Sequence, residues 1–165
     1  MHLGRFFRHV VMHPARASQA FPPRVMDAIQ AEIRAQEATH RGEILFVVEA
    51  ELSTWQLWHD VQPRERAREV FALRGAWNTE ENNGILIYVL LAERVVEIVA
   101  DRGIAKRVDE AQWRGVCEEM QRAFADGRFQ DGAVAGVRGV AALLEREFPG
   151  SPRHANELPD RPALI

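Results

Sequence analysis

The chain has 165 residues, of which 47% are hydrophobic and 27% are charged, so it is long and apolar enough for one globular domain with a real core. The formal net charge of −3 gives no field that favours nucleic acid, and the single cysteine excludes an internal disulfide. The longest apolar run, Ile85–Ala92, is far shorter than the about 20 residues of a membrane span, and the amino-terminal segment lacks the apolar stretch of a signal peptide. We therefore expect a soluble, cytoplasmic protein with no transmembrane segment and no nucleic-acid partner.

The first 21 residues predict an irregular arm before the domain. Their mixture of basic and apolar residues allows a weak contact with a membrane surface, while docking on the domain or fraying are the plainer interpretations. The next segment, 22–148, predicts the α/β domain, and 149–165 is rich in proline and polar residues, which predicts a disordered tail. The pattern of apolar residues predicts helix, strand, helix, strand, strand, helix and helix, over residues 22–40, 43–50, 63–76, 84–91, 95–100, 109–127 and 129–148.

This order of elements predicts the topology of the sheet. A strand followed by a helix and a second strand is expected to be a right-handed, parallel crossover. The two residues Glu93 and Arg94 between the second and third strands leave room only for a hairpin, so the third strand runs antiparallel. Both faces of the second strand are apolar, which places it in the middle of the sheet. The chain is therefore expected to form a three-layer α/β sandwich with a small mixed sheet.

The same topology brings acidic and amide side chains to one end of the sheet. The start of the first strand, the loop before the second and the residues after the third all meet there, and glycines allow backbone carbonyls to approach. Carboxylate and amide oxygens are the ligands of hard cations such as Ca²⁺ and Mg²⁺. The alternative is a solvated loop face with an ordinary turn at 83–84. The candidate metal ligands are Glu43, Glu80, Glu81, Asn82, Asn83 and Asp101.

Other candidate sites are weaker. His9 and His13 have the spacing of a helical pair but no third ligand nearby, which disfavours zinc. Cys117 falls on the apolar stripe of its helix and is expected in the core. No phosphate-binding glycine loop and no nucleophile elbow occurs, so we expect no organic cofactor. The four tryptophans are expected to pack: Trp55, Trp58, Trp77 and Trp113.

The central block resembles the TPM domain family, which is named after a thylakoid-lumen phosphatase, a photosystem II repair protein and a receptor-modulating protein. The block WNTEENNGILIYVLLAERVVEIVADRGI at 77–104 carries most of the resemblance, together with the strand that follows Gly42 and the segment GRFQDG at 127–132. The resemblance covers about residues 22–148 and is closest to short soluble bacterial members. It implies a Rossmann-like α/β/α sandwich, a divalent-metal site in an acidic cleft at the six residues above and, for some members, a weak acid phosphatase activity.

Two features depart from the family pattern. Members often carry an aspartate before the first helix, whereas segment 16–21 has no acidic residue. Many members also have a signal peptide and a membrane anchor, and we expect neither here.

Two functions of different classes remain open. In the first, the domain is an accessory or interaction module with a protein partner and a Ca²⁺ or Mg²⁺ site. In the second, it is a metal-assisted acid phosphatase, in which Asp101 helps hold the metal and Arg102 stabilises the phosphoryl charge. No dedicated nucleophile stands out, which favours the first.

Overall fold

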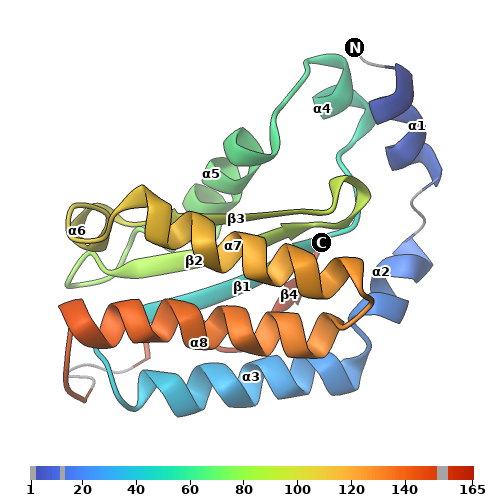
Figure 1. Cartoon of the computed structure of the whole chain (residues 1–165). Helices are drawn as coiled ribbons and strands as arrows, with labels where there is room; N and C mark the ends of the chain where they lie inside the picture. Colours follow the sequence, from blue (N-terminus) through green and yellow to red (C-terminus); the bar gives the residue numbers. More distant parts are fainter. Residues whose placement is uncertain (1–2, 12–13, 152–155) are drawn as a thin grey trace.

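The computed structural model describes residues 3–11, 14–151 and 156–165 (Figure 1). Its elements agree in type and order with the seven predicted from the sequence, and several short elements are added. They are α1 (Leu3–Val11), α2 (Pro14–Ala20), α3 (Pro23–Glu37), β1 (Glu43–Glu49), α4 (Thr54–Trp58), α5 (Pro63–Leu73), β2 (Gly84–Leu90), the 3₁₀ turn η1 (Leu91–Glu93), β3 (Val95–Ala100), α6 (Arg102–Ala105), α7 (Glu110–Ala125), α8 (Phe129–Glu147) and β4 (Ala163–Leu164).

The four strands of the described residues form one mixed sheet in the order β3-β2-β1-β4. β1 pairs in parallel with β2 and begins opposite it, with Glu43 beside Gly84. β2 and β3 form the predicted antiparallel hairpin, in which Ile85 faces Ala100. The position of β2 between two partners therefore confirms that it is an interior strand.

Helices cover the two faces of this sheet unequally. Ile85, Ile87 and Val89 of β2 belong to the larger core, which they share with α3, α7 and α8. Figure 1 shows these three helices side by side along the sheet. The alternate residues, such as Tyr88, lie in a smaller core with α5. Every residue of β2 is buried, because its side chains point alternately to the two faces of the sheet and both faces are covered. The fold is thus a mixed α/β domain with a four-stranded sheet.

The amino-terminal arm is helical and docked, so the expectation of an irregular arm is wrong for its described residues. Arg5 donates from Nε to Oε1 of Glu93 at 2.8 Å, and Nε2 of His9 lies 2.9 Å from the same oxygen. The backbone N–H of Leu52 donates to Nδ1 of His9 at 3.0 Å. These contacts attach α1 to η1 and to the segment after β1. They join residues more than 40 positions apart, which no local sequence pattern reveals.

The carboxy-terminal tail also differs from the prediction where it is described. β4 pairs in parallel with β1, with Ala163 beside Val47. Leu158 is buried in the smaller core, and Arg34 of α3 holds Asp160 at 2.7 Å. The expected disorder is therefore wrong for residues 156–165, since two residues that complete a sheet edge outweigh a polar, proline-rich composition. The prediction for 152–155 lies outside the described residues.

Three of the four tryptophans do not pack as expected. Trp55 and Trp58 of the unpredicted helix α4 are 66% and 71% exposed, and Trp77 is 55% exposed. Only Trp113 enters the core. Helix α4 forms because Ser53 and Gln56 make a capping box at its start. At the start of α7, Asp109 holds the N-cap position without a side-chain hydrogen bond.

Candidate functional site

Two loops meet at the end of the sheet where β1 and β2 begin, as the topology predicts. The N–H of Asp101 donates to the carbonyl of Gly84 at 2.9 Å, and the N–H of Gly103 donates to the carbonyl of Asn82 at 2.9 Å. A side chain at Gly103 would place its Cβ 2.8 Å from the Glu81 carbonyl oxygen and closer still to that of Asn82. Glycine is therefore what allows the two loops to touch.

Asp101 is the central carboxylate of this end. It is the N-cap of α6, and its Oδ1 accepts the N–H of Arg102 at 2.7 Å. The residue is only 8% exposed, and its other oxygen, Oδ2, is buried with no hydrogen-bond partner among the described residues. A buried carboxylate oxygen without a partner is costly. Oδ2 of Asp101 is thus a fixed hydrogen-bond acceptor that has no partner among the described residues.

The amide side chains of the loop already have protein partners. Asn82 adopts a left-handed backbone with φ of 52°, and its Oδ1 accepts from Nε of Arg102 at 2.8 Å. Asn83 is buried, and its Nδ2 donates to the carbonyl of Arg41 at 2.8 Å. Asn83 therefore links the loop to the segment before β1. The side-chain oxygen of Asn82 is already hydrogen-bonded to the guanidinium group of Arg102.

Arg41 supplies a second positive charge that the sequence analysis did not include. Its Nη1 lies 3.0 Å from the carboxylate of Glu81, and its guanidinium lies 6.0 Å from the centre of the Phe148 ring. The sequence could have indicated this residue, because Arg41 lies two positions before the start of β1 and so belongs to the same end of the sheet. Arg41 and Arg102 together offset part of the acidic charge.

The side chain of Glu43 and the backbone of Glu80 contact the carboxy-terminal tail. Oε2 of Glu43 accepts the N–H of Leu158 at 3.3 Å, and the N–H of Glu80 donates to Oε2 of Glu157 at 3.0 Å. Burial raises the pKa of Glu43 above its ordinary value, against the lowering effect of backbone hydrogen bonds from Leu158 and Glu157. The tail therefore engages part of the predicted ligand set, although the sequence indicated no order there.

A second acidic group lies behind Glu43 and was not predicted. Glu37, near the end of α3, accepts the N–H of Ile44 at 2.8 Å. Burial, with smaller contributions from Glu43 and Asp160, raises its pKa from 4.5 to about 8. Next along the chain, His40 is fully buried, accepts the N–H of Gly42 at Nδ1, and has a pKa lowered to about 4 by burial.

A further polar network borders the smaller core, and its three side chains are hydrogen-bonded to one another. The hydroxyl of Tyr88 donates to Oε2 of Glu49 at 2.5 Å, and Arg66 donates to both oxygens of the same carboxylate. Burial raises the pKa of Tyr88. All three groups have partners, which is typical of a structural ion pair in a core.

The donor set fits a cation only in part. Asp101 has a free oxygen, but the oxygens of Glu81 and Asn82 are shared with Arg41 and Arg102. Within residues 3–11, 14–151 and 156–165, no group of three His, Cys, Asp or Glu side chains is arranged to hold a metal ion. A cation at this end would therefore depend on one carboxylate, on backbone and amide oxygens, and on water.

Known proteins resemble this chain in both fold and sequence. The TPM domain family matches residues 17–143, and the chain belongs to this family. The BA42 protein of the psychrophilic bacterium Bizionia argentinensis, solved by NMR, is 28% identical, with a TM-score of 0.71 over 86% of this chain and 93% of that one. The N-terminal domain of a P. gingivalis protein is 22% identical, with a TM-score of 0.57 over 76% of each chain, and so shares the fold. No curated protein matches.

Among the described helices, none combines the length and apolar character that a membrane crossing requires.

Proposed function

We propose that this TPM domain is an accessory binding module whose acidic end responds to Ca²⁺ or Mg²⁺. One observation carries the proposal: Oδ2 of Asp101 is buried without a partner at a point where two loops already converge. A hard cation would satisfy this oxygen and compensate the carboxylates around it. As part of the same proposal, the fold is a Rossmann-like three-layer sandwich, since α5 and the trio α3, α7 and α8 border opposite cores.

The arrangement supports weak binding. To recruit Glu81 or Asn82, a cation has to compete with the guanidinium groups of Arg41 and Arg102. Sites with few charged ligands bind Ca²⁺ with dissociation constants of about 10⁻⁴ to 10⁻³ M. Such an affinity suits a module whose loops respond to cation concentration. The protein partner and a cytoplasmic location belong to the proposal as well.

The alternative is metal-assisted hydrolysis of phosphomonoesters, with Asp101 and Arg102 in the site. The exposed guanidinium of Arg102 next to Asp101 favours it. However, Nε of Arg102 donates to Asn82, and Oδ1 of Asp101 accepts the backbone N–H of Arg102. Both side chains therefore already take part in hydrogen bonds that stabilise these loops. Function resides in the site rather than in the fold, and these hydrogen bonds favour binding over catalysis.

A weak contact with a membrane surface is a further part of the proposal. Phe7 of α1 is 68% exposed beside the exposed Arg8, and Trp55 and Trp58 are exposed on α4. Aromatic and basic side chains are those found at membrane interfaces. Sedimentation with anionic vesicles tests this: Phe7→Ser with Trp58→Ser should abolish pelleting, and equal pelleting of the variant excludes this surface.

The experiment for the acidic end is an NMR titration of backbone amides with CaCl₂ and MgCl₂. The amides of Asn82, Asn83 and Gly103 should shift in a saturable way in the wild type. Asp101→Asn should remove the shifts, while Asp109→Asn, a matched change at an exposed N-cap, should retain them. No saturable shift with either cation excludes the metal-responsive module.

A parallel assay with p-nitrophenyl phosphate separates the two functions. Turnover that is lost in Asp101→Asn and Arg102→Gln, and retained in Asp109→Asn, establishes the phosphatase. Saturable cation binding without turnover establishes the binding module.

A further inference from the structure

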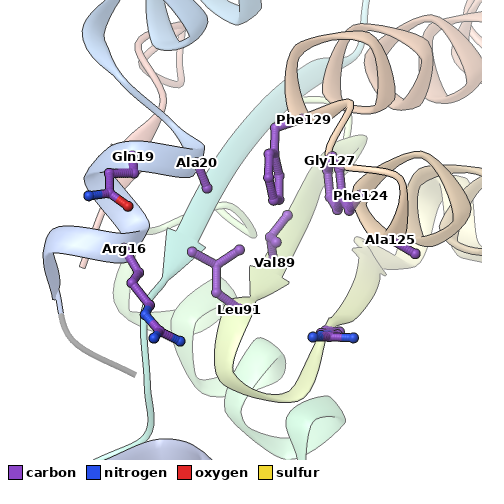
Figure 2. Close-up of a pocket in the computed structure, with 10 residues that line it drawn as sticks. Arg16, Gln19, Ala20, Val89, Leu91, Phe124, Ala125, Gly127 and Phe129 are labelled. Carbon is purple, nitrogen blue, oxygen red and sulfur yellow. The ribbon is translucent and has the colours of Figure 1, made fainter. Parts of the chain in front are cut away.

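The molecule has a cavity at the end of the sheet opposite to the acidic loops. Its volume is about 430 Å³, within the range of small-molecule sites. It lies where β2 ends, between α2 and the corner that joins α7 to α8 (Figure 2). In open α/β sheets, ligands bind preferentially outside the carboxyl ends of the strands. The lining residues are Arg16, Gln19, Ala20, Val89, Leu91, Arg94, Phe124, Ala125, Gly127 and Phe129.

Apolar side chains form most of the wall. Val89 and Leu91 come from the end of β2 and the turn after it, and Phe124 and Phe129 come from the corner between the helices. The two phenylalanine rings are stacked with centres 5.5 Å apart, and Phe21 supports Phe129 from behind at 5.6 Å. Figure 2 shows Gln19 and Arg16 across the cavity from the rings. This wall suits an apolar body.

The polar groups at the cavity are cationic. Arg16 and Arg94 both line it, and within the described part of the chain neither guanidinium group makes an ion pair or a hydrogen bond. No aspartate or glutamate is among the lining residues. The nearest carboxylate in sequence, Glu93, is held by Arg5 and His9 of α1. Two guanidinium groups beside an apolar wall therefore lack a counter-charge.

The backbone at Arg94 adds an independent observation. Arg94 has φ of 56°, a left-handed conformation that glycine or asparagine adopts at lower cost. An arginine at the turn between β2 and β3 is therefore unfavourable for the hairpin alone. Strained positions of this kind cluster at functional sites. The strain is explained if the guanidinium serves the cavity.

We propose that this cavity binds a small amphiphilic carboxylate, with its apolar body against Phe124, Phe129 and Leu91 and its carboxylate between Arg16 and Arg94. Arginine pairs well with carboxylates because its planar fork matches their two oxygens. The volume suits a body the size of a medium-chain fatty acid. This site shares no lining residue with the acidic end, so it is independent of the proposed cation response.

The test is a titration of the full chain with octanoate, followed by NMR amide shifts. Octanoate should shift Val89, Leu91, Gly127 and Phe129 in a saturable way, and 1-octanol should bind about tenfold more weakly because it lacks the charge. Acetate and inorganic phosphate should produce no shift there. Absence of octanoate binding, equal binding of octanol, or equal shifts with the small anions would each overturn the proposal. Octyl phosphate binding more tightly than octanoate would overturn the choice of a carboxylate in favour of a phosphate head group.

Variants locate the site. Arg94→Asn keeps a residue that tolerates the left-handed backbone, and both it and Arg16→Gln should weaken octanoate binding about tenfold. Arg114→Gln, a matched change at an exposed arginine of α7, should leave the affinity unchanged. Ala20→Phe should fill the cavity and abolish binding, and its amide spectrum shows whether the fold is kept. Asp101→Asn should bind octanoate as the wild type does, which separates this site from the acidic end. Unchanged affinity in both Arg16→Gln and Arg94→Asn would contradict the proposed head-group site.

Discussion

The two ends of the sheet treat charge in opposite ways. At the end where β1 and β2 begin, carboxylates gather, and the chain supplies its own cations, with Arg41 on Glu81 and Arg102 on Asn82. At the other end, Arg16 and Arg94 line an apolar cavity that contains no carboxylate. The first end is therefore largely self-compensated, although Oδ2 of Asp101 has no hydrogen-bond partner among the described residues, whereas the second end has uncompensated charge. The difference indicates where an external ligand has the most to gain.

The largest expected effect concerns the acidic end and pH. Glu37 is partly buried near Glu43 and Asp160, and Arg34 makes an ion pair with Asp160. Burial, with smaller contributions from these two carboxylates, raises the pKa of Glu37 from 4.5 to about 8. The folded state therefore holds a proton that the unfolded state releases between these values, so the free energy of unfolding falls as pH rises through this window. Glu37→Gln should remove this contribution to the decline, which for a pKa shift of this size is on the order of 5 kcal/mol.

Urea unfolding at several pH values checks this prediction, with Glu119→Gln, an exposed carboxylate on α7, as the control. The control should follow the wild-type curve. If Glu37→Gln has the same pH dependence as the wild type, Glu37 is ionised in the fold and the acidic end is less crowded than we infer. His40 acts with the opposite sign, because its lowered pKa removes stability as pH falls from 6.5 to about 4.

The sequence predicted what depends on local pattern and on topology. The continuous apolar run after Gly84 identified β2, and the crossover rule placed Asp101 beside the loop of Asn82. It did not predict contacts between distant residues of little local pattern. Arg5 meets Glu93 across 88 positions, and β4 adds only two residues to the sheet. A helix or strand shows a periodic spacing of apolar residues along the sequence, whereas a single ion pair between distant residues produces no such pattern.

The cavity escaped prediction for a related reason. Its wall comes from α2, from the end of β2 with the turn after it, and from the corner between α7 and α8, and each contributes only a few residues of ordinary type. Phe124 and Phe129 are partly buried and pack against the larger core, so their apolar character alone does not distinguish them from core residues. The exposed Trp55 shows the reverse error, since apolar character alone did not reveal that α4 presents it to solvent.

The next largest effect is expected from disturbing the contact between the two loops at the acidic end. Gly103→Ala would force a methyl group against the carbonyls of Asn82 and Glu81, and overpacking of this kind costs about 1–3 kcal/mol. Gly115→Ala, in the middle of α7 with no neighbour within 4 Å, should instead stabilise by about 0.5–1 kcal/mol. Chemical denaturation measures both. Equal effects of the two changes would mean that the loops at the acidic end separate easily.

The cavity end should show a trade between stability and binding. Arg94→Gly relieves the left-handed backbone at φ of 56° and should stabilise the fold by about 0.5–1 kcal/mol while weakening octanoate binding. Arg94→Ala removes the same guanidinium but keeps the strain, so it should lose binding without the gain in stability. Thermal unfolding with and without octanoate measures both quantities. A stability gain in Arg94→Ala equal to that in Arg94→Gly would show that side-chain charge, not backbone strain, is unfavourable at this turn.

The smallest effect expected is the response of the melting temperature to cations at the acidic end. At a cation concentration equal to the dissociation constant, binding to the folded state adds only about 0.4 kcal/mol, or a rise of about 1–2 °C for a domain of this size. The melting temperature should rise with millimolar Ca²⁺ and return when a chelator is added.

Glu80→Gln combined with Asp101→Asn should abolish the response and stabilise the metal-free protein, since like charges are removed. The pair Asp109→Asn and Glu119→Gln changes net charge equally at exposed positions of α7 and should leave the response intact. If both pairs lose it equally, the cation acts through net charge and not at Asp101. If the wild type melts identically with Ca²⁺, Mg²⁺ and chelator, the self-compensation by Arg41 and Arg102 is complete, and the cation-binding and metal-assisted phosphatase proposals both fail.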